Sequence, residues 1–275
     1  MKADFNQSTA LVTGASSGLG EEFARQLGRE VGTLVLVARR EDRLQALAGE
    51  LRQRHPSLRV EVVACDLAEE TARAGLVERL QVEGLEVDLL INNAGLGDIG
   101  PVASANWEKL DAILQVNMTA LTHLTRLLVP GMVARGRGVV LNVSSTAGFL
   151  PLPEFGVYAA SKAYVNSFSE ALRFELKDTG VFVTALCPGP VATEFGQVAA
   201  RPDGGRQFAP PESLTEPAEG VVAAALAAAR AGRPRVIPGA MVRGTMLLLE
   251  SVPRPWLRGL LGAGEWVLTR FGRGA

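Results

Sequence analysis

The chain has 275 residues, of which 47% are hydrophobic, so it can bury a sizeable core within one domain. Its 28 lysines and arginines nearly balance 29 aspartates and glutamates, which disfavours nucleic acid or an acidic membrane as the main partner. The amino terminus lacks a leader-like apolar run, and no stretch reaches the about 18 apolar residues of a membrane span. We therefore expect a cytoplasmic protein that acts on a small molecule.

Short β-branched runs alternate along the chain with longer amphipathic stretches. Strands that are separated by helix-length segments form βαβ units, whose right-handed crossovers build a parallel sheet covered by helices on both faces. The pattern therefore predicts a single-domain α/β fold with a doubly wound parallel sheet of about seven strands. The expected strands are 9–13, 33–37, 60–64, 88–91, 139–143, 181–186 and 235–237.

A glycine-rich loop, Thr13-Gly-Ala-Ser-Ser-Gly-Leu-Gly20, follows the first expected strand and opens a helical pattern. Such glycines permit a tight turn, close approach of the backbone to a pyrophosphate, and tight helix packing. The loop lacks the Gly-Lys-Ser/Thr ending of a nucleotide-hydrolysing P-loop. Its place between strand and helix predicts dinucleotide binding, with contacts from Gly14, Ser16, Ser17, Gly18, Leu19 and Gly20.

The end of the second expected strand bears on the choice between NAD and NADP. The sequence Val37-Ala-Arg-Arg40 offers no carboxylate to an adenine ribose, whereas a guanidinium can fork onto a 2′-phosphate. We therefore expect NADP in preference to NAD, with Arg39 at the phosphate. The alternative is that Arg39, Arg40 and Arg43 only begin a solvated helix.

Polar residues also end the third and fourth expected strands. Asp66 can accept a hydrogen bond from the adenine amino group, or it can cap the next helix. Asn92-Asn-Ala-Gly95 places small residues where a backbone can approach a ribose, and an amide that can tie neighbouring strands, although an ordinary turn would look similar. The expected cofactor contacts here are Asp66, Leu67, Asn93, Ala94 and Gly95.

A tyrosine and a lysine, Tyr158 and Lys162 in Tyr-Ala-Ala-Ser-Lys, are spaced to lie on one face of a helix. Tyrosine alone, with a pKa of about 10, would be a poor base near neutrality. A nearby ammonium can lower the pKa of the phenol and prepare it for proton transfer. With Ser144 and Ser145 just upstream, the set indicates carbonyl and alcohol redox chemistry.

The last third of the chain contains two segments without a clear strand pattern. Residues 194–216 are rich in proline and glycine, which favours a loop that is long enough to be a lid. Residues 239–275 form an apolar tail, for which we expect amphipathic helices packed on the body or on a sister subunit. A lipophilic wall or a membrane-surface contact is the alternative for this tail. We accordingly divide the chain into a catalytic domain, 1–238, and an extension.

Together these motifs resemble the classical short-chain dehydrogenase/reductase family from about residue 9 to residue 237. The resemblance rests on the glycine motif at 13–20, Asn-Asn-Ala-Gly at 92–95, Tyr-x-x-x-Lys at 158–162, and on Asn117, the serine, Pro188-Gly189 and Thr193, in the family's order. It implies a Rossmann-like sheet with the strand order 3-2-1-4-5-6-7, and a homodimer or homotetramer. The tail after residue 238 exceeds the usual family end.

The resemblance also assigns roles to single residues. Tyr158 is implied as the acid/base, and Lys162 supplies positive charge and binds the nicotinamide ribose. Ser145 is implied to steady the substrate oxygen, and Asn117 to hold a water that links Lys162 to solvent. The segment that orients the nicotinamide is implied to contain Pro188, Gly189, Val191 and Thr193.

The implied function is an NADP(H)-dependent oxidoreductase that passes a hydride between the nicotinamide and a ketone, an aldehyde or a secondary alcohol. Apolar residues of the lid and tail favour a lipophilic substrate, namely Phe195, Phe208, Met241 and Trp256. One alternative is a 3-oxoacyl thioester reductase, with Arg135 and Arg137 near the pocket mouth for an acidic carrier protein. Another is a non-catalytic NADP-binding sensor or scaffold.

Metal chemistry is not expected from the histidines and cysteines. His55 and His123 have no ligand spacing to Cys65 or Cys187, so we expect no metal site. The two cysteines lie in apolar stretches, which predicts buried structural thiols rather than a disulfide framework.

Overall fold

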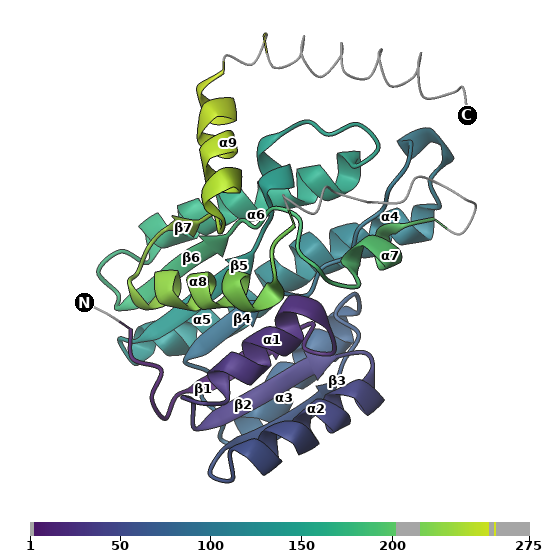
Figure 1. Ribbon diagram of the computed structural model, residues 1–275. Helices are drawn as coiled ribbons and strands as arrows, with labels where there is room; N and C mark the ends of the chain where they lie inside the picture. Colours follow the sequence, from purple (N-terminus) through teal and green to yellow (C-terminus); the bar gives the residue numbers. More distant parts are fainter. Residues whose placement is uncertain (1–2, 202–214, 253–255, 257–275) are drawn as a thin grey trace. The chain divides into compact units, whose positions relative to one another are not determined.

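The computed structural model describes residues 3–201, 215–252 and 256 of the chain (Figure 1). The chain divides into two compact units, Met1–Pro238 and Gly239–Ala275. The first unit contains the sheet and the candidate site, and the second contains helix α9 (Ala240–Ser251).

Among the described residues, seven parallel strands form one sheet in the order β3-β2-β1-β4-β5-β6-β7. This confirms the predicted Rossmann-like fold and its strand order. The strand order reverses once, between β1 and β4, and in sheets of this kind ligands bind in the crevice at that point. The strands are β1 (Thr9–Thr13), β2 (Thr33–Ala38), β3 (Arg59–Ala64), β4 (Leu89–Asn92), β5 (Gly138–Val143), β6 (Val181–Leu186) and β7 (Arg235–Val236).

The core lies on both faces of this sheet because its central strands contain nearly continuous apolar runs. On β1, Ala10 and Val12 pack into one core layer, while Leu11 between them packs into the other. Alternate side chains of a strand point to opposite faces, so a continuous apolar run feeds both layers.

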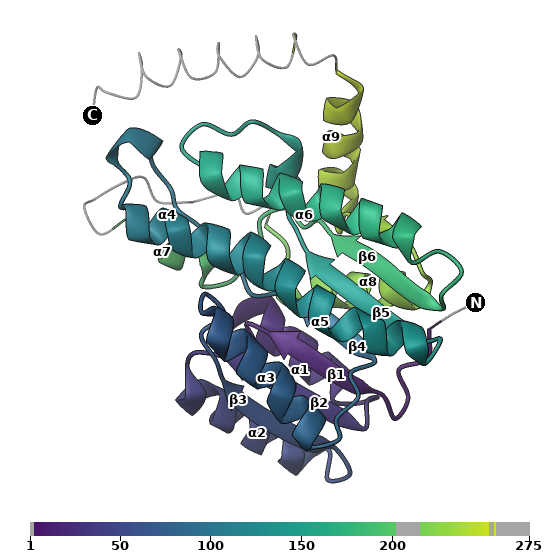
Figure 2. The same ribbon diagram turned by 180° about the vertical axis from the view of Figure 1, so that it is seen from behind.

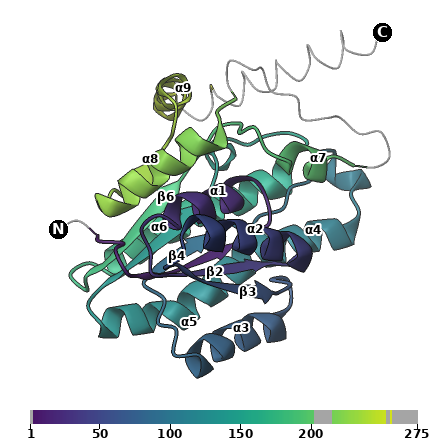
Figure 3. The same ribbon diagram turned by 60° about the horizontal axis from the view of Figure 1, so that its bottom comes forward.

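Helices cover the two faces in separate sets, as Figures 2 and 3 show. One core layer contains side chains of α1 (Gly18–Leu27), α2 (Glu41–Arg54) and α8 (Ala218–Arg230). The other contains side chains of α3 (Glu70–Val82), α5 (Leu121–Ala134) and α6 (Gly156–Glu175). Helix α6 ends at Glu175, and β6 begins at Val181.

The helical stretch 107–135 is not one regular helix. It consists of α4 (Trp107–Leu114), a π-helical turn (Gln115–Ala120) and α5, with Asn117 inside the π turn. A π turn within an α-helix often marks a functional site, because it redirects side chains relative to the regular helix. The hydrophobic pattern did not reveal this turn, since π and α turns differ by only one residue in spacing.

The segment predicted as a lid begins with a short helix, α7 (Phe195–Ala199). Val191, which lies before this segment, and Glu216, its last residue, form a parallel β-bridge. Residues 202–214 of the predicted lid, including Phe208, lie outside the described residues.

The second unit contributes α9, which carries several apolar side chains in Ala-Met-Val-Arg-Gly-Thr-Met-Leu-Leu-Leu. The predicted packing of the tail on the domain or on a sister subunit stays a prediction, and residues 253–255 and 257–275 lie outside the described residues. Within the part of the chain that the structure describes, no helix combines the length and the apolar character that crossing a membrane requires.

Candidate active site

A pocket of about 720 Å³ lies where the parallel strands end. Its lining includes residues directly after β1, β2, β3, β4, β5 and β6, together with residues of α6 and α7. The size falls in the range typical of small-molecule and cofactor sites. Of the residues expected from the sequence to be catalytic or to contact the cofactor, all but Gly20 and Asn117 line this pocket.

The glycine-rich loop is shaped by contacts that leave no room for side chains. A Cβ on Gly20 would lie 2.2 Å from the backbone oxygen of Gly14, and a Cβ on Gly14 would lie 2.9 Å from the Cα of Ala94. Gly14 and Gly18 also have positive φ angles of 67° and 57°, a conformation that favours glycine. The loop therefore presents bare backbone to the pocket, as a pyrophosphate site requires.

The side chains of Thr13 and Asn93 join this loop to the end of β4. The Thr13 hydroxyl accepts hydrogen bonds from the backbone N–H groups of Asn93 and Ala94, at 2.9 and 3.0 Å. The Asn93 amide donates to the Thr13 carbonyl at 2.8 Å. These bonds fix the two loops relative to each other at the switch of strand order.

The neighbouring Asn92 ties strands together within the core. Its amide donates to Asn142 Oδ1 on β5 at 2.9 Å and to Thr125 Oγ1 on α5 at 3.1 Å. The sequence offered both a strand-tying amide and an ordinary turn for this segment. The structure has the strand-tying arrangement.

Two arginines line the pocket at the end of β2, and Arg40 makes the contacts to the glycine-rich loop. Its guanidinium donates to Ser17 Oγ at 2.8 Å and to Ser16 Oγ at 3.2 Å. Arg39, the residue expected from the sequence at the phosphate, lines the same pocket and is exposed. Adjacent residues point in different directions at a strand end. The sequence alone therefore could not show which of Arg39 and Arg40 contacts the glycine-rich loop.

Asp66 stabilises the turn after β3. Its carboxylate accepts a hydrogen bond from the Ala68 N–H at 3.0 Å, and the residue also lines the pocket. The cap of α3 is Glu69, so Asp66 is not the N-cap of the next helix. Asp66 and Leu67 are therefore available to an adenine ring at this edge of the pocket.

The same turn rests on a buried arginine that the sequence did not reveal. Arg73, 2% exposed, donates to the carbonyl oxygens of Leu67 and Ala68 at 2.6 and 3.0 Å. Its Nε donates to His123 Nδ1 at 3.1 Å, which gives that histidine a structural partner. An arginine within a charged helix gives no sequence signal of burial, because only the tertiary fold turns it inward.

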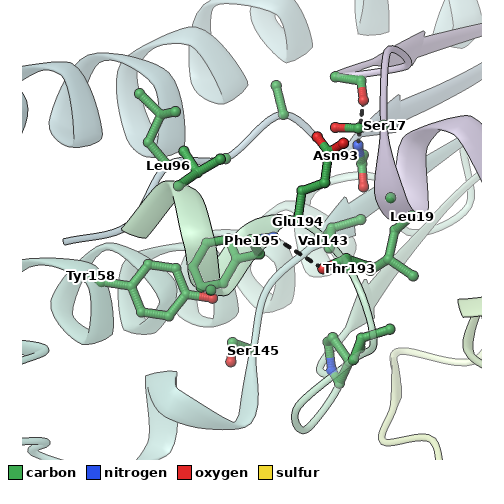
Figure 4. Close-up of a pocket in the computed structure, with 18 of the residues that line it drawn as sticks. Ser17, Leu19, Asn93, Leu96, Val143, Ser145, Tyr158, Thr193, Glu194 and Phe195 are labelled. Atoms are coloured by element: carbon green, nitrogen blue, oxygen red, sulfur yellow. Dashed lines mark hydrogen bonds between the residues drawn. The ribbon is translucent and has the colours of Figure 1, made fainter. Parts of the chain in front are cut away.

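Tyr158 and Lys162 lie one helical turn apart on α6 and face the pocket. Both are buried, with 8% and 4% of their surface exposed. The Lys162 ammonium donates to the Val143 carbonyl at 2.9 Å and lies 5.7 Å from the centre of the Tyr158 ring. In Figure 4 the phenol oxygen of Tyr158 points toward the hydroxyl of Ser145 at the end of β5.

Asn117 lies behind the pocket wall. Its Oδ1 accepts from the Leu96 N–H at 2.8 Å, and its amide donates to the Leu96 carbonyl at 3.0 Å and to Ser161 Oγ at 2.9 Å. A Cβ on Gly95 would lie 3.6 Å from Asn117 Oδ1 and 3.3 Å from Lys162 Nζ. The π-helical turn thus brings Asn117 to the same glycine that borders Lys162.

The segment after β6 passes over the glycine-rich loop. Pro188 accepts a hydrogen bond from the Thr146 N–H at 2.9 Å, which attaches it to the end of β5. Thr193 accepts from the Phe195 N–H at 3.4 Å at the start of α7, and a Cβ on Gly18 would lie 3.2 Å from Thr193 Cγ2. The residues expected from the sequence to orient the nicotinamide all line the pocket, and they are Pro188, Gly189, Val191 and Thr193.

Comparison with known proteins agrees with this arrangement. The family model described as short chain dehydrogenase matches residues 8–203. The chain belongs to the short-chain dehydrogenase/reductase family. A very-long-chain 3-oxoacyl-CoA reductase from Anas platyrhynchos is 34% identical over 196 residues. That match covers 69% of this chain but only 62% of the relative's length.

Solved structures of the family superpose on nearly the whole chain. A short-chain dehydrogenase from Sphingobium yanoikuyae in complex with NADPH has a TM-score of 0.79 and 31% identity, and the match covers 98% of both chains. A bulky-bulky ketone specific alcohol dehydrogenase from Comamonas testosteroni has a TM-score of 0.74 and 29% identity, with 90% of this chain and 96% of that one covered. Similar structures hold either NADPH or NAD, so the fold alone does not decide the cofactor.

In this short-chain dehydrogenase, burial determines the proton affinities of the tyrosine and the lysine. Burial raises the pKa of Tyr158 to about 12, although the Ser145 hydrogen bond opposes that shift. Burial also lowers the pKa of Lys162 to about 8. The pKa of the phenol is therefore raised and not lowered as expected, because the cost of removing the phenolate from water outweighs the hydrogen bond with Ser145.

These pKa values predict a pH dependence for the carbonyl reduction that we propose below for this short-chain dehydrogenase. Tyr158 keeps its proton throughout the neutral range, whereas Lys162 loses its charge as the pH rises through about 8. The value of kcat/KM should therefore be constant near neutrality and fall above about pH 8.

Lys162→Arg tests the assignment, because an arginine keeps its charge beyond pH 12. Steady-state measurements from pH 6 to about 10 should show kcat/KM falling at high pH for the parent enzyme but not for Lys162→Arg. If kcat/KM of Lys162→Arg falls at the same pH as that of the parent enzyme, a group other than Lys162 causes the decrease.

An apolar wall surrounds the phenol of this short-chain dehydrogenase. The rings of Phe155 and Phe195 lie 5.5 and 5.2 Å from the Tyr158 ring, in edge and tilted contacts. Met241 and Trp256, which the sequence analysis also considered for this wall, belong to the second unit. Further apolar residues of the lining are Leu96, Val116, Leu150, Leu152 and Val198.

A buried ion pair holds the end of α7 in place. Arg201 Nε donates to Asp98 Oδ1 at 3.0 Å, and Lys109 Nζ lies 3.3 Å from the same oxygen. Burial alone would raise the pKa of Asp98, but hydrogen bonds from Arg201 and Lys109 hold it below its usual value. This short-chain dehydrogenase thus fastens α7, and Phe195 with it, to the loop after β4.

The described residues contain no cluster of three histidine, cysteine, aspartate or glutamate side chains that could hold a metal ion. Both cysteines are buried and do not bond to each other. The Cys187 thiol donates to Asn166 Oδ1 at 3.2 Å, and burial raises the pKa of the Cys65 thiol.

Proposed function

We propose that this protein is an NADP(H)-dependent oxidoreductase that transfers a hydride between the nicotinamide and a lipophilic ketone, aldehyde or secondary alcohol. The observation that carries the proposal is the convergence of Tyr158, Ser145 and Lys162 in one pocket with a bare-backbone glycine-rich loop. The nicotinamide supplies the hydride donor or acceptor when it is bound.

The chain's own residues have distinct roles in this proposal. Tyr158 donates its phenolic proton to the carbonyl oxygen in reduction and takes a proton from the alcohol in oxidation. Ser145 donates a hydrogen bond to the same oxygen and polarises the carbonyl, which is most effective in a dry site. Lys162 keeps a positive charge beside the phenol, and Asn117 holds a water that links Lys162 to solvent.

NADP is the proposed cofactor because the residues at the end of β2 suit a phosphate. Two arginines and two serine hydroxyls meet there, and phosphate oxygens accept hydrogen bonds from both kinds of donor. Neither position 39 nor position 40 carries the acid that binds the adenine ribose in NAD-dependent folds.

Substituting the two arginines separately should identify the phosphate ligand. Because Arg40 already contacts both serines, Arg40→Ala should weaken NADPH binding by about tenfold to 100-fold, the effect of losing one charge-assisted hydrogen bond. Arg39→Ala should weaken it less, and NADH binding should change little in either variant. Titration of protein with each nucleotide in the absence of substrate measures these constants. An equal loss of NADPH and NADH affinity in Arg40→Ala would instead assign the residue to loop structure.

The apolar wall around Tyr158 supports a lipophilic substrate. Aliphatic and aromatic side chains dominate the lining on the phenol side of the pocket, and they exclude water from the reacting carbonyl. The alternative, a 3-oxoacyl thioester reductase, is favoured by the relative from Anas platyrhynchos, whose name describes that activity.

The carrier-protein version of that alternative receives less support. Arg135 and Arg137 contact Asp88, which precedes β4, and so lie at the amino ends of the strands rather than beside the pocket. A coenzyme A thioester does not require a protein-docking patch at that position.

A panel of carbonyl compounds tests the proposed function directly. The rate of NADPH oxidation is followed at the nicotinamide absorbance band. It should be higher with bulky ketones than with 3-oxoacyl thioesters for the proposed function, and the reverse for the thioester reductase. Binding of NADPH without turnover on any substrate would favour the sensor or scaffold. The cytoplasmic location and the homo-oligomer inferred from the sequence stay predictions.

A further inference from the structure

Glu194 connects two parts of the chain that are far apart in sequence. Its two carboxylate oxygens lie 2.8 Å from Arg43 Nη1 and 3.2 Å from Arg40 Nη1. Glu194 directly precedes α7, whereas Arg40 and Arg43 lie at the start of α2. The carboxylate therefore connects the segment after β6 to the segment after β2.

The partners of Glu194 are the groups that a 2′-phosphate would use. Arg40 binds Ser16 and Ser17 with two of its nitrogens and Glu194 with the third. Arg40, Ser16, Ser17 and Glu194 all line the pocket. A guanidinium has a limited number of donors in a fixed planar fork, so one anion occupies it at the expense of another.

The contact is suited to exchange rather than to permanent closure. The side chains of Arg40 and Glu194 are each 42% exposed, and that of Arg43 is 46% exposed. Ion pairs between such exposed groups are weak in water, and a phosphate carries more charge than a carboxylate. Hydrogen bonds from Arg43 and Arg40 hold the pKa of Glu194 below its usual value, so the competing negative charge is present at neutral pH.

We infer that Glu194 is a specificity-determining residue whose carboxylate competes with the cofactor 2′-phosphate for Arg40 and Arg43. This inference rests on the proposed NADP(H) function and deepens it. Binding of NADP(H) separates Glu194 from the arginines, whereas NAD(H), which lacks the phosphate, leaves them paired. The acid that lowers NADP affinity thus lies in the segment after β6. It does not lie at the end of β2, where the acid of NAD-binding folds is usually found.

Glu194→Gln tests the inference because it removes the charge and keeps the shape. The dissociation constants of NADPH and NADH are measured by titration without substrate. NADPH should bind the variant about threefold to tenfold more tightly, the effect of removing two exposed ion pairs, while NADH affinity should stay within about twofold. Adenosine 2′,5′-bisphosphate should gain affinity in the same proportion as NADPH.

Two control variants show whether the effect of Glu194 depends on its contact with the arginines or only on its negative charge. Glu41→Gln removes an equal charge from the first turn of α2, and it should leave the ratio of NADPH to NADH affinity nearly unchanged. In the Arg40→Ala/Arg43→Ala background, Glu194→Gln should no longer improve NADPH binding, because the groups in competition are gone.

The outcomes distinguish this inference from the proposed function. An unchanged or weaker NADPH affinity in Glu194→Gln, with a parent protein that prefers NADPH, would overturn the role of Glu194 alone. An equal gain for NADPH and NADH would also overturn it, since the 2′-phosphate is the only difference between them. A parent protein that binds NADPH no more tightly than NADH would instead remove the cofactor assignment in the proposed function.

Discussion

Tyr158→Phe should lower kcat for NADPH-dependent carbonyl reduction by about 10²- to 10⁴-fold, the usual contribution of a positioned general acid. The substitution removes only the phenolic oxygen, so the ring keeps its contacts with Phe155 and Phe195. The dissociation constant of NADPH should stay within about twofold, because the charge of Lys162 and the glycine-rich loop are untouched. Single-turnover rates and nucleotide titration measure the two quantities separately.

The second tyrosine of the chain is a matched control on the same helix. Tyr164 exchanges a hydrogen bond of 2.8 Å with Thr122 Oγ1, and its ring stacks on Phe168 with 5.8 Å between centroids. Tyr164→Phe should cost about 1 kcal/mol of stability at most, from one lost hydrogen bond, and leave kcat unchanged. Full activity in Tyr158→Phe would refute the proton-transfer role, and loss of NADPH binding in that variant would show a structural defect instead.

Gly20→Ala should abolish tight nucleotide binding. The added Cβ would lie 2.2 Å from the Gly14 backbone oxygen and 2.5 Å from the Asn93 amide nitrogen, so the glycine-rich loop must move away from β4. Overpacking of this kind typically costs about 1–3 kcal/mol, and a displaced loop should weaken NADPH and NADH alike by about 10- to 100-fold. Urea unfolding and nucleotide titration check both effects.

Gly49→Ala provides the same substitution at a helical site with free space. No atom lies within 4 Å of a Cβ at Gly49 in the middle of α2. Replacement of such a glycine should raise the free energy of unfolding by about 0.5–1 kcal/mol and leave nucleotide affinity unchanged. Equal nucleotide affinity in Gly20→Ala and Gly49→Ala would mean that the tight loop is unnecessary for binding.

Much of the fold was predictable because its strands are buried on both faces. Continuous apolar runs such as Leu34-Val-Leu-Val37 identify such strands, and the observed β2 (Thr33–Ala38) differs from the predicted 33–37 by one residue. The glycine-rich loop and the Tyr-x-x-x-Lys pair were also recognisable, since their chemistry requires particular residue types at fixed spacing. The structure brings these two motifs to one pocket.

Features that depend on tertiary contacts were not predictable. The sequence could not show that Arg40 contacts the glycine-rich loop, nor that Arg73 is buried beneath Leu67. The direction of the Tyr158 pKa shift also differs from the expectation, because the extent of desolvation is set by the packed environment and not by the spacing to Lys162. Roles assigned by family resemblance alone, such as the water relay at Asn117, stay predictions.

The two anchors that flank residues 202–214 have a consequence for protein engineering. Arg201 is fixed by Asp98, and Glu216 pairs with Val191, so contacts within the domain hold the residues on both sides of this stretch. Doubling the number of residues between two fixed ends costs only about 0.6 kcal/mol of closure entropy. Segments of other lengths could therefore be grafted between these anchors at a small cost in stability, with Tyr158 and the glycine-rich loop left unchanged.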